Sequence, residues 1–258
     1  MQIFNQYYAG DNDAQEYQLK LHLFTFAIFA CFGAFVAGWL NTLWMAVIVS
    51  ILVTRWMIVF HELFHLRKPE DLDYLSRLQI IPFSPFNMGY REYRDMHMRH
   101  HKYAATANDP DAFHIMGGPL KALFGSVTQQ EQATFRYIKA NGISRELATM
   151  IAIRLSLFIL MFLIGPTAFL IWWLVLRATY IVNDFVFFHL VHYRSGNNGS
   201  FPIPLPKYIK YPAILVYGID VVYATMHHDI HHKHARIAAK NLPKLDKELN
   251  ADYHMKQC

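Results

Sequence analysis

The chain has 258 residues, of which 54% are apolar and 17% are charged, and its formal net charge is +5. This apolar share exceeds that of soluble globular proteins and is typical of a membrane protein. The two cysteines, Cys31 and Cys258, exclude a disulfide framework and a cysteine-based metal site, and no recognition motif accompanies the basic surplus, which argues against nucleic-acid binding.

Four apolar stretches are long enough to cross a bilayer, since about 20 apolar residues span a hydrocarbon core of about 30 Å. The predicted spans are residues 21–39, 43–66, 150–168 and 169–192. Short turns join the first two and the last two. The sequence therefore predicts an all-α membrane protein, a single integral-membrane domain over residues 1–258 with four transmembrane helices in two hairpins.

The basic residues predict the orientation of the spans. The two short turns, near residues 40–42 and 164–171, contain no Lys or Arg. By the positive-inside rule, both termini and the segments 67–149 and 193–258 are cytoplasmic. These segments are expected to form a histidine-rich cap with interfacial helices, and the apolar stretch 78–90 is expected to lie in the interface as well. The polar N-terminal residues and compact length favour a bacterial inner-membrane protein.

Histidines gather in three short clusters. Their members are His61 and His65; His97, His100 and His101; and His228, His231 and His232. The spacings are i, i+4 or i, i+3, i+4, which on an α-helix place the members of a cluster on one face, where they can be directed at a common metal. His189 and His192 form a fourth group at i, i+3.

Depth in the membrane brings the four groups to one side. Eighteen residues separate Leu43 from His61, or about 27 Å of helix at about 1.5 Å per residue, so His61 stands at the cytoplasmic end of its span. His189 has the same position in the last span. One zinc ion needs three or four ligands, whereas nine imidazoles suit two ions with open positions, and imidazole suits non-haem iron, which carries out O₂ chemistry.

Two alternatives come from other classes of protein. His61, Glu62 and His65 form the H-E-x-x-H pattern of a zinc protease, in which the glutamate is the general base. That reading leaves the two later clusters without a role. A metal transporter would place its ligands near the bilayer midplane, whereas the midplanes of these spans are apolar. Both remain remote alternatives.

The three clusters in this order, interleaved with two hairpins, resemble the histidine boxes of the membrane-bound fatty acid desaturase–hydroxylase superfamily. "HMRHHKYAATANDPDAF" (97–113) is similar to the second box with its Asp-Pro-Asp tail, and "NLPKL" (241–245) to a segment after the third box. The resemblance covers residues 20–245. It implies a di-iron centre held by the eight clustered histidines and one further ligand from the last span, His189 or His192. His192, followed closely by Arg194, resembles the carotenoid ketolase branch and is preferred.

The resemblance also implies groups beside the ligands. Asp109 and Asp111 would orient ligands or anchor the box, and Glu62 would be a neighbour of His61. Asp184 either orients a ligand histidine or pairs with Arg177 in the same span. The isolated histidines, His22, His114, His234 and His254, are interpreted as ordinary surface or core residues.

By the same resemblance, the two irons activate O₂ so that hydrogen is removed from an unactivated C–H bond of a lipid chain. Fatty acyl desaturation is the leading expectation, and carotenoid ketolation or hydroxylation and terminal alkane or acyl hydroxylation are the alternatives. Because no cytochrome segment is fused to the chain, electrons are expected from a separate ferredoxin, rubredoxin or cytochrome partner.

Overall fold

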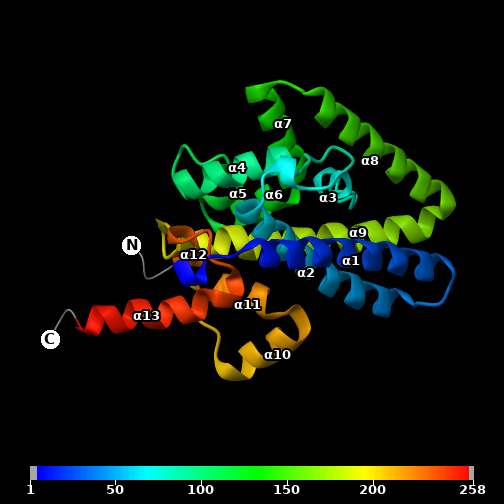
Figure 1. The fold of residues 1–258 in the computed structure, drawn as a ribbon. Helices are drawn as coiled ribbons and strands as arrows, with labels where there is room; N and C mark the ends of the chain where they lie inside the picture. Colours follow the sequence, from blue (N-terminus) through cyan, green and yellow to red (C-terminus); the bar gives the residue numbers. More distant parts are fainter. Residues whose placement is uncertain (1–4, 256–258) are drawn as a thin grey trace.

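A computed structural model describes residues 5–255, without the side chains of Asn5 and of residues 251–255, and it is almost entirely helical (Figure 1). Of the described residues, four helices are long and apolar enough to cross a membrane. They are α1 (Asp11–Val36), α2 (Thr42–Leu66), α8 (Arg145–Ile164) and α9 (Pro166–Asp184), the last continued by a π-helical turn, η3 (Phe185–Leu190). The predicted all-α membrane fold with four spans is confirmed.

The remaining elements are short and connect or cap the long helices. The helices are α3 (Tyr74–Leu78), α4 (Tyr90–Tyr103), α5 (Ala112–Ile115), α6 (Pro119–Val127), α7 (Gln129–Asn141), α10 (Lys207–Tyr217), α11 (Ile219–Met226), α12 (His228–Lys233) and α13 (Leu242–Met255). Single 3₁₀ turns are η1 (Asn5–Tyr7), η2 (Pro69–Asp71) and η4 (Ala239–Asn241), and β1 (Tyr193–Arg194) pairs with β2 (Asn197–Asn198).

Two span boundaries differ from the prediction for local reasons. Helix α1 begins at Asp11 rather than at residue 21, because its polar first turns are stabilised: the Asp13 carboxylate accepts from the Gly10 N–H at 2.9 Å, and Lys20 pairs with Glu16 at 2.6 Å. The second hairpin turns at Gly165 rather than after residue 168. Helix α9 starts at Pro166, and proline suits a first helical position because its missing N–H is not needed there.

Helix α2 is the centre of the bundle and packs against α1 and α9. Aromatic side chains fill the contacts: Trp56 and Phe60 stack with ring centroids 4.8 Å apart, and Phe32 lies 5.1 Å from Trp172. Helix α8 packs against α9 close to their turn and then diverges from it (Figure 1). The core around α2 thus combines aromatic rings with aliphatic side chains such as Val49, Val53 and Leu63.

The segment 78–90 occupies the space between α8 and α9. Ile81, Phe83 and Met88 are fully buried, and Arg154 of α8 donates to the backbone carbonyls of Leu78 and Asn87. This stretch therefore packs most of its apolar side chains against protein, while Phe86 is exposed, and its place in the membrane interface stays a prediction.

Both hairpin turns lie at one end of the long helices, and α4, α5, α12 and α13 lie at the opposite end (Figure 1). Because the clustered histidines belong to α2, α4 and α12, the fold places them at the end remote from the turns, as the position of His61 in its span predicted. The sequence-distant ends of the described chain meet there too: Tyr8 forms an isolated β-bridge with Ile237.

Candidate metal centre

A tyrosine fixes the helix of the second box against the helix of the first. The Tyr90 hydroxyl, at the first residue of α4, lies 2.6 Å from the Leu63 carbonyl and 2.8 Å from the Arg67 carbonyl and donates to one of them. The Leu63 carbonyl lies in the last turn of α2, where it also accepts from the Arg67 N–H at 2.9 Å, and Arg67 follows the last residue of the helix. This contact brings the face of α4 that carries His97 against His65.

Five histidines converge in the first group, which consists of His61, His65, His97, His101 and His231. The Nε2 atom of His97 lies 3.0 Å from Nε2 of His65 and 3.0 Å from Nε2 of His101. The His231 ring completes the group, with its centroid 4.9 Å from that of His61 and 4.8 Å from that of His65.

Four histidines converge in the second group, His100, His192, His228 and His232. The Nε2 atom of His192 lies 3.1 Å from Nε2 of His100 and 3.1 Å from Nε2 of His228, and the His232 ring lies 4.7 Å from the His192 ring. The groups are adjacent, since His101 of the first stacks on His232 of the second with ring centroids 4.2 Å apart.

The second and third boxes each divide between the two groups. His97 and His101 belong to the first group and His100 to the second, while His231 belongs to the first and His228 and His232 to the second. The expectation that every cluster faces a common metal is therefore wrong for these two boxes. Adjacent residues of an α-helix point about 100° apart, so the two rings of each His-His pair lie in different groups.

The nitrogen geometry fits metal ligands better than hydrogen bonds. The Nε2 of His97 faces two other ring nitrogens at 3.0 Å, and a single ring nitrogen has one proton or one lone pair to offer. Two nitrogens bound at right angles to one ion at about 2.1 Å would lie about 3.0 Å apart. In addition, both ring nitrogens of His231 and His232 are buried without a hydrogen-bond partner.

The protonation state of the clustered histidines also fits metal binding. Burial, reinforced by neighbouring imidazoles, lowers the pKa of His101 to about 2. Burial and nearby imidazoles also hold the pKa of His97, His228 and His231 well below the ordinary value of 6.5. These rings are neutral at physiological pH, which is the form that binds metal ions.

The structure separates the two candidates of the last span. His192 lies in the second group, and its Nδ1–H donates to the Gly199 carbonyl at 2.8 Å. His189 lies outside both groups, where its Nδ1 is 2.8 Å from the Ile115 carbonyl and its ring stacks on Tyr193. The different directions of the two histidines result from η3, because its wider π-helical turn redirects the side chains after Phe185.

Two carboxylates adjoin members of the groups. The His100 Nδ1–H donates to Asp109 at 2.9 Å, which leaves the His100 Nε2 lone pair for a metal. Burial alone would raise the pKa of Asp109, but hydrogen bonds from His100 and two backbone N–H groups lower it. Glu62 lies 3.3 Å from His61 Nδ1 without hydrogen-bond geometry, and it accepts from the Ala239 N–H at 2.9 Å.

Asp111 and Asp184 contact a histidine outside the boxes. His114 is fully buried, with Nδ1 2.9 Å from Asp184 and Nε2 3.3 Å from Asp111. Arg177, the other candidate partner of Asp184, pairs instead with Glu131 at 2.9 Å. Burial alone would lower the pKa of His114, but the two carboxylates outweigh it and raise this pKa to about 10.

The sequence pattern missed this arrangement. His114 is a core residue, as interpreted from the sequence, but the sequence did not reveal its partners, Asp111 three residues before it and Asp184 70 residues after it. The other isolated histidines differ. His22 lies 3.0 Å from Asp73 in a partly exposed pair, and the side chain of His254 lies outside the described residues.

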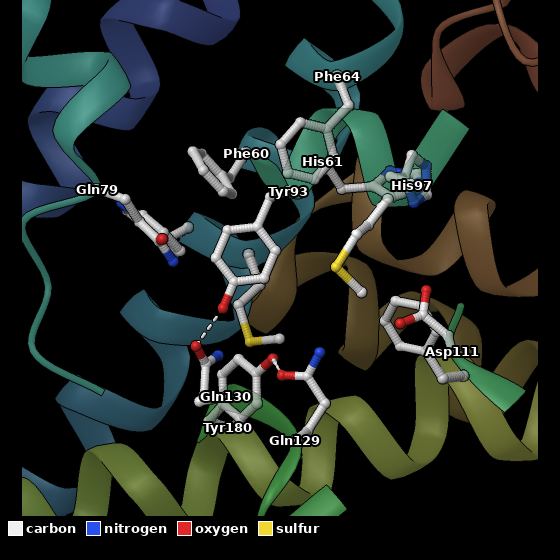
Figure 2. A pocket seen from close by; sticks show the side chains of 14 residues that line it. Phe60, His61, Phe64, Gln79, Tyr93, His97, Asp111, Gln129, Gln130 and Tyr180 are labelled. Atoms are coloured by element: carbon white, nitrogen blue, oxygen red, sulfur yellow. Dashed lines mark hydrogen bonds between the residues drawn. The ribbon is translucent and has the colours of Figure 1, made fainter. Parts of the chain in front are cut away.

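Four cavities surround the groups. A chamber lined by Met57, Phe187, Phe188 and five of the clustered histidines lies between the two groups. A wider groove of about 540 Å³ is lined by residues of α2, α9, η3, α10 and α11, and Phe187 lines both this groove and the chamber. A third pocket extends from His61 and His97 between α2, α4, α7 and α9 (Figure 2).

A fourth cavity is basic. It has a volume of about 360 Å³ and contains His65 of the first group. Its cationic lining residues are Arg67, Lys68, Arg94 and Arg236, against the single carboxylate of Asp71. This cleft therefore connects a member of the first group with a positively charged surface.

Comparison with known proteins gives one match. A family model described as fatty acid desaturase matches residues 37–257, which include both histidine groups. No curated protein and no solved structure matches the chain.

Proposed function

Because the chain belongs to the fatty acid desaturase family, we propose that it uses O₂ and a pair of iron ions to oxidise the hydrocarbon chain of a membrane lipid, with desaturation of an acyl chain as its reaction. The observation that carries the proposal is the convergence of nine histidines, from four segments, in two adjacent groups at one end of the spans. A zinc protease would need three of these ligands and would leave the second group unused.

The first group would hold one iron and the second group the other. Iron so bound supplies the oxidising power for cleavage of an unactivated C–H bond. The protein's own contribution is positional: Asp109 orients His100, the Gly199 carbonyl orients His192, and both hydrogen bonds aim Nε2 at the second site. Met57, Phe187 and Phe188 line the chamber between the groups and exclude water from it.

The groove that shares Phe187 with the chamber suits entry of a lipid from the bilayer. Its lining is mainly apolar and includes Val182, Leu190 and Tyr217, which are exposed at positions where lipid would surround the bundle. A hydrocarbon chain that enters there would pass Phe187 and reach the histidines. Both groups and the chain ends would face the cytoplasm of a bacterial inner membrane.

We further propose that an acidic electron-carrier protein docks at the basic cleft beside His65. Charge reversal by the double substitution Lys68→Glu, Arg236→Glu is expected to raise the KM for an acidic ferredoxin about tenfold or more at low salt, because both side chains are exposed cations at the rim. Steady-state oxidation with increasing ferredoxin measures this effect.

The control for docking is Lys139→Glu, an equivalent charge reversal on the exposed side of α7. It is expected to leave the KM for ferredoxin unchanged. Turnover with a small chemical reductant is expected to be the same in the wild type, the double variant and the Lys139→Glu protein. An equal KM for ferredoxin in the double variant and the wild type would contradict docking at this cleft.

The product profile tests the reaction itself. Expression in a host that makes both fatty acids and carotenoids is expected to give acyl chains with a new double bond, detected by gas chromatography, and His97→Ala is expected to abolish them. A new ketone or hydroxyl on carotene with unchanged fatty acids would replace acyl desaturation with the carotenoid reaction. About one zinc per chain, no iron and no oxidised lipid would overturn the proposal as a whole.

A further inference from the structure

The pocket that extends from His61 and His97 has an apolar wall and polar far side. Aromatic side chains form the wall near the histidines, where Phe60 lies 4.8 Å from Phe64 and 6.3 Å from Tyr93 by ring centroids. In Figure 2, Gln79 and Gln130 lie on the side of the pocket away from His97. Glutamine is seldom fully buried, so two glutamine amides at the end of an aromatic pocket indicate a binding role.

Each of these amides has a polar atom without a partner. Gln79 is 4% exposed and Gln130 is 1% exposed. The Oε1 of Gln79 and the Nε2 of Gln130 have no hydrogen-bond partner among the described residues. The neighbouring Gln129 differs, because its Oε1 accepts from the Tyr180 hydroxyl (Figure 2). The pocket therefore presents an unused acceptor and an unused donor, and leaving such buried atoms unpaired costs free energy.

The protein holds Gln79 in this position at a conformational cost. Gln79 has φ of +50°, in the left-handed region that non-glycine residues seldom adopt. The segment is held on both sides, since Arg154 donates to the carbonyls of Leu78 and Asn87. A strained backbone conformation that surrounding contacts enforce is common where a side chain must be aimed at a ligand.

We propose that this pocket selects a lipid whose buried end carries a hydroxyl group, which hydrogen-bonds to Gln79 and Gln130 while the reacting carbon lies at the histidine groups. The inference rests on the proposed function and specifies its substrate class. A hydroxyl both donates and accepts, so it suits either orientation of the two amides. A carboxylate or phosphate does not fit, because the described lining residues include Asp111 but no Lys or Arg.

Binding of matched probes tests the proposal without turnover. The iron-loaded protein in phosphatidylcholine nanodiscs, kept free of O₂ and reductant, is titrated with ω-hydroxy fatty acids of about 10 to 16 carbons and with the corresponding plain fatty acids. The carboxylate of either probe remains at the membrane surface, so the pair differs only at the buried end. At the best chain length, the hydroxylated probe is expected to bind about tenfold or more tightly.

Substitution of the amides should remove this preference. Gln79→Met replaces a side chain that forms no hydrogen bond with the described residues, so we expect normal folding and an affinity ratio of the two probes near one. Gln130→Met is the second variant, and Tyr93→Phe measures the effect of losing the Tyr93–Gln130 hydrogen bond alone. The control is Gln132→Met on α7, whose amide donates to Thr128 at 2.6 Å and is exposed; it should retain the preference.

Equal affinity for the two probes in the wild type, or no binding of either, overturns the selection of a hydroxylated end. The same holds if both amide variants keep the preference. These outcomes can be distinguished from those of the product profile. Oxidation of plain acyl chains with equal binding of the two probes would support the proposed function and contradict the selection of a hydroxylated end. Tight binding of the hydroxylated probe without lipid oxidation would support the pocket assignment and contradict the proposed function.

Discussion

Replacing His192 by alanine is expected to lower the iron content from two ions per chain to about one and to abolish lipid oxidation, whereas replacing His189 by alanine keeps both ions. The second group has four members, and His192 is the one whose Nε2 lies 3.1 Å from two of the others. Its loss leaves three histidines in the second group and removes the only member of that group from outside the boxes. Iron analysis of the purified proteins measures the result.

The two variants are matched, because they remove the same side chain three residues apart in one span. His189 is as deeply buried as His192, and its Nδ1 contact with the Ile115 carbonyl is structural. His189→Ala is therefore expected to lower the melting temperature while leaving the iron content unchanged. Loss of iron from the His189 variant and not from the His192 variant would reverse the assignment.

The substitution His114→Ala is expected to destabilise the protein by about 3–5 kcal/mol, because it leaves the buried carboxylates of Asp111 and Asp184 without their cation. For a chain of this length, that corresponds to a fall in melting temperature of roughly 10 °C. The control is His22→Ala, which removes a histidine from a partly exposed pair with Asp73 and should cost less than about 1 kcal/mol. Similar losses in the two variants would contradict the pairing at His114.

The same group predicts a pH dependence of stability. The folded-state pKa of His114 is raised to about 10 from 6.5 by Asp184 and Asp111, against the opposing effect of burial. Protonated His114 is therefore favoured by folding, so its stabilisation is complete below about pH 6.5 and is lost as the pH rises toward about 10. Thermal unfolding of the wild type should weaken over this range, and the His114→Ala protein should lack this component. A parallel decline in both proteins would refute it.

The sequence could predict the spans and the side of the bundle that carries the histidines, because both depend on local properties. A span needs about 20 apolar residues, and the position of His61 relative to Leu43 follows from the helical rise. The division of the boxes was also within reach: His100 and His101 are adjacent, and adjacent residues of a helix point about 100° apart.

Other features depend on contacts between distant segments and leave no local pattern. Asp184 and His114 meet only because α5 packs against η3. The π-helical turn that separates the directions of His189 and His192 has no signature in their i, i+3 spacing. The four cations of the basic cleft come from the link between α2 and η2, from α4 and from the segment before η4, so their common surface exists only in the folded chain.

The mixed origin of both histidine groups has a consequence for the assembly of the protein during synthesis. Each group combines members from residues up to 101 with members from residues 228–232, and Glu62 is held by Ala239, which lies still later in the chain. Neither site has its full ligand set until the ribosome has passed residue 232 and all four spans have been made. The iron ions proposed for these groups would therefore be acquired late in biogenesis, and a chain truncated before α12 would have neither histidine group complete.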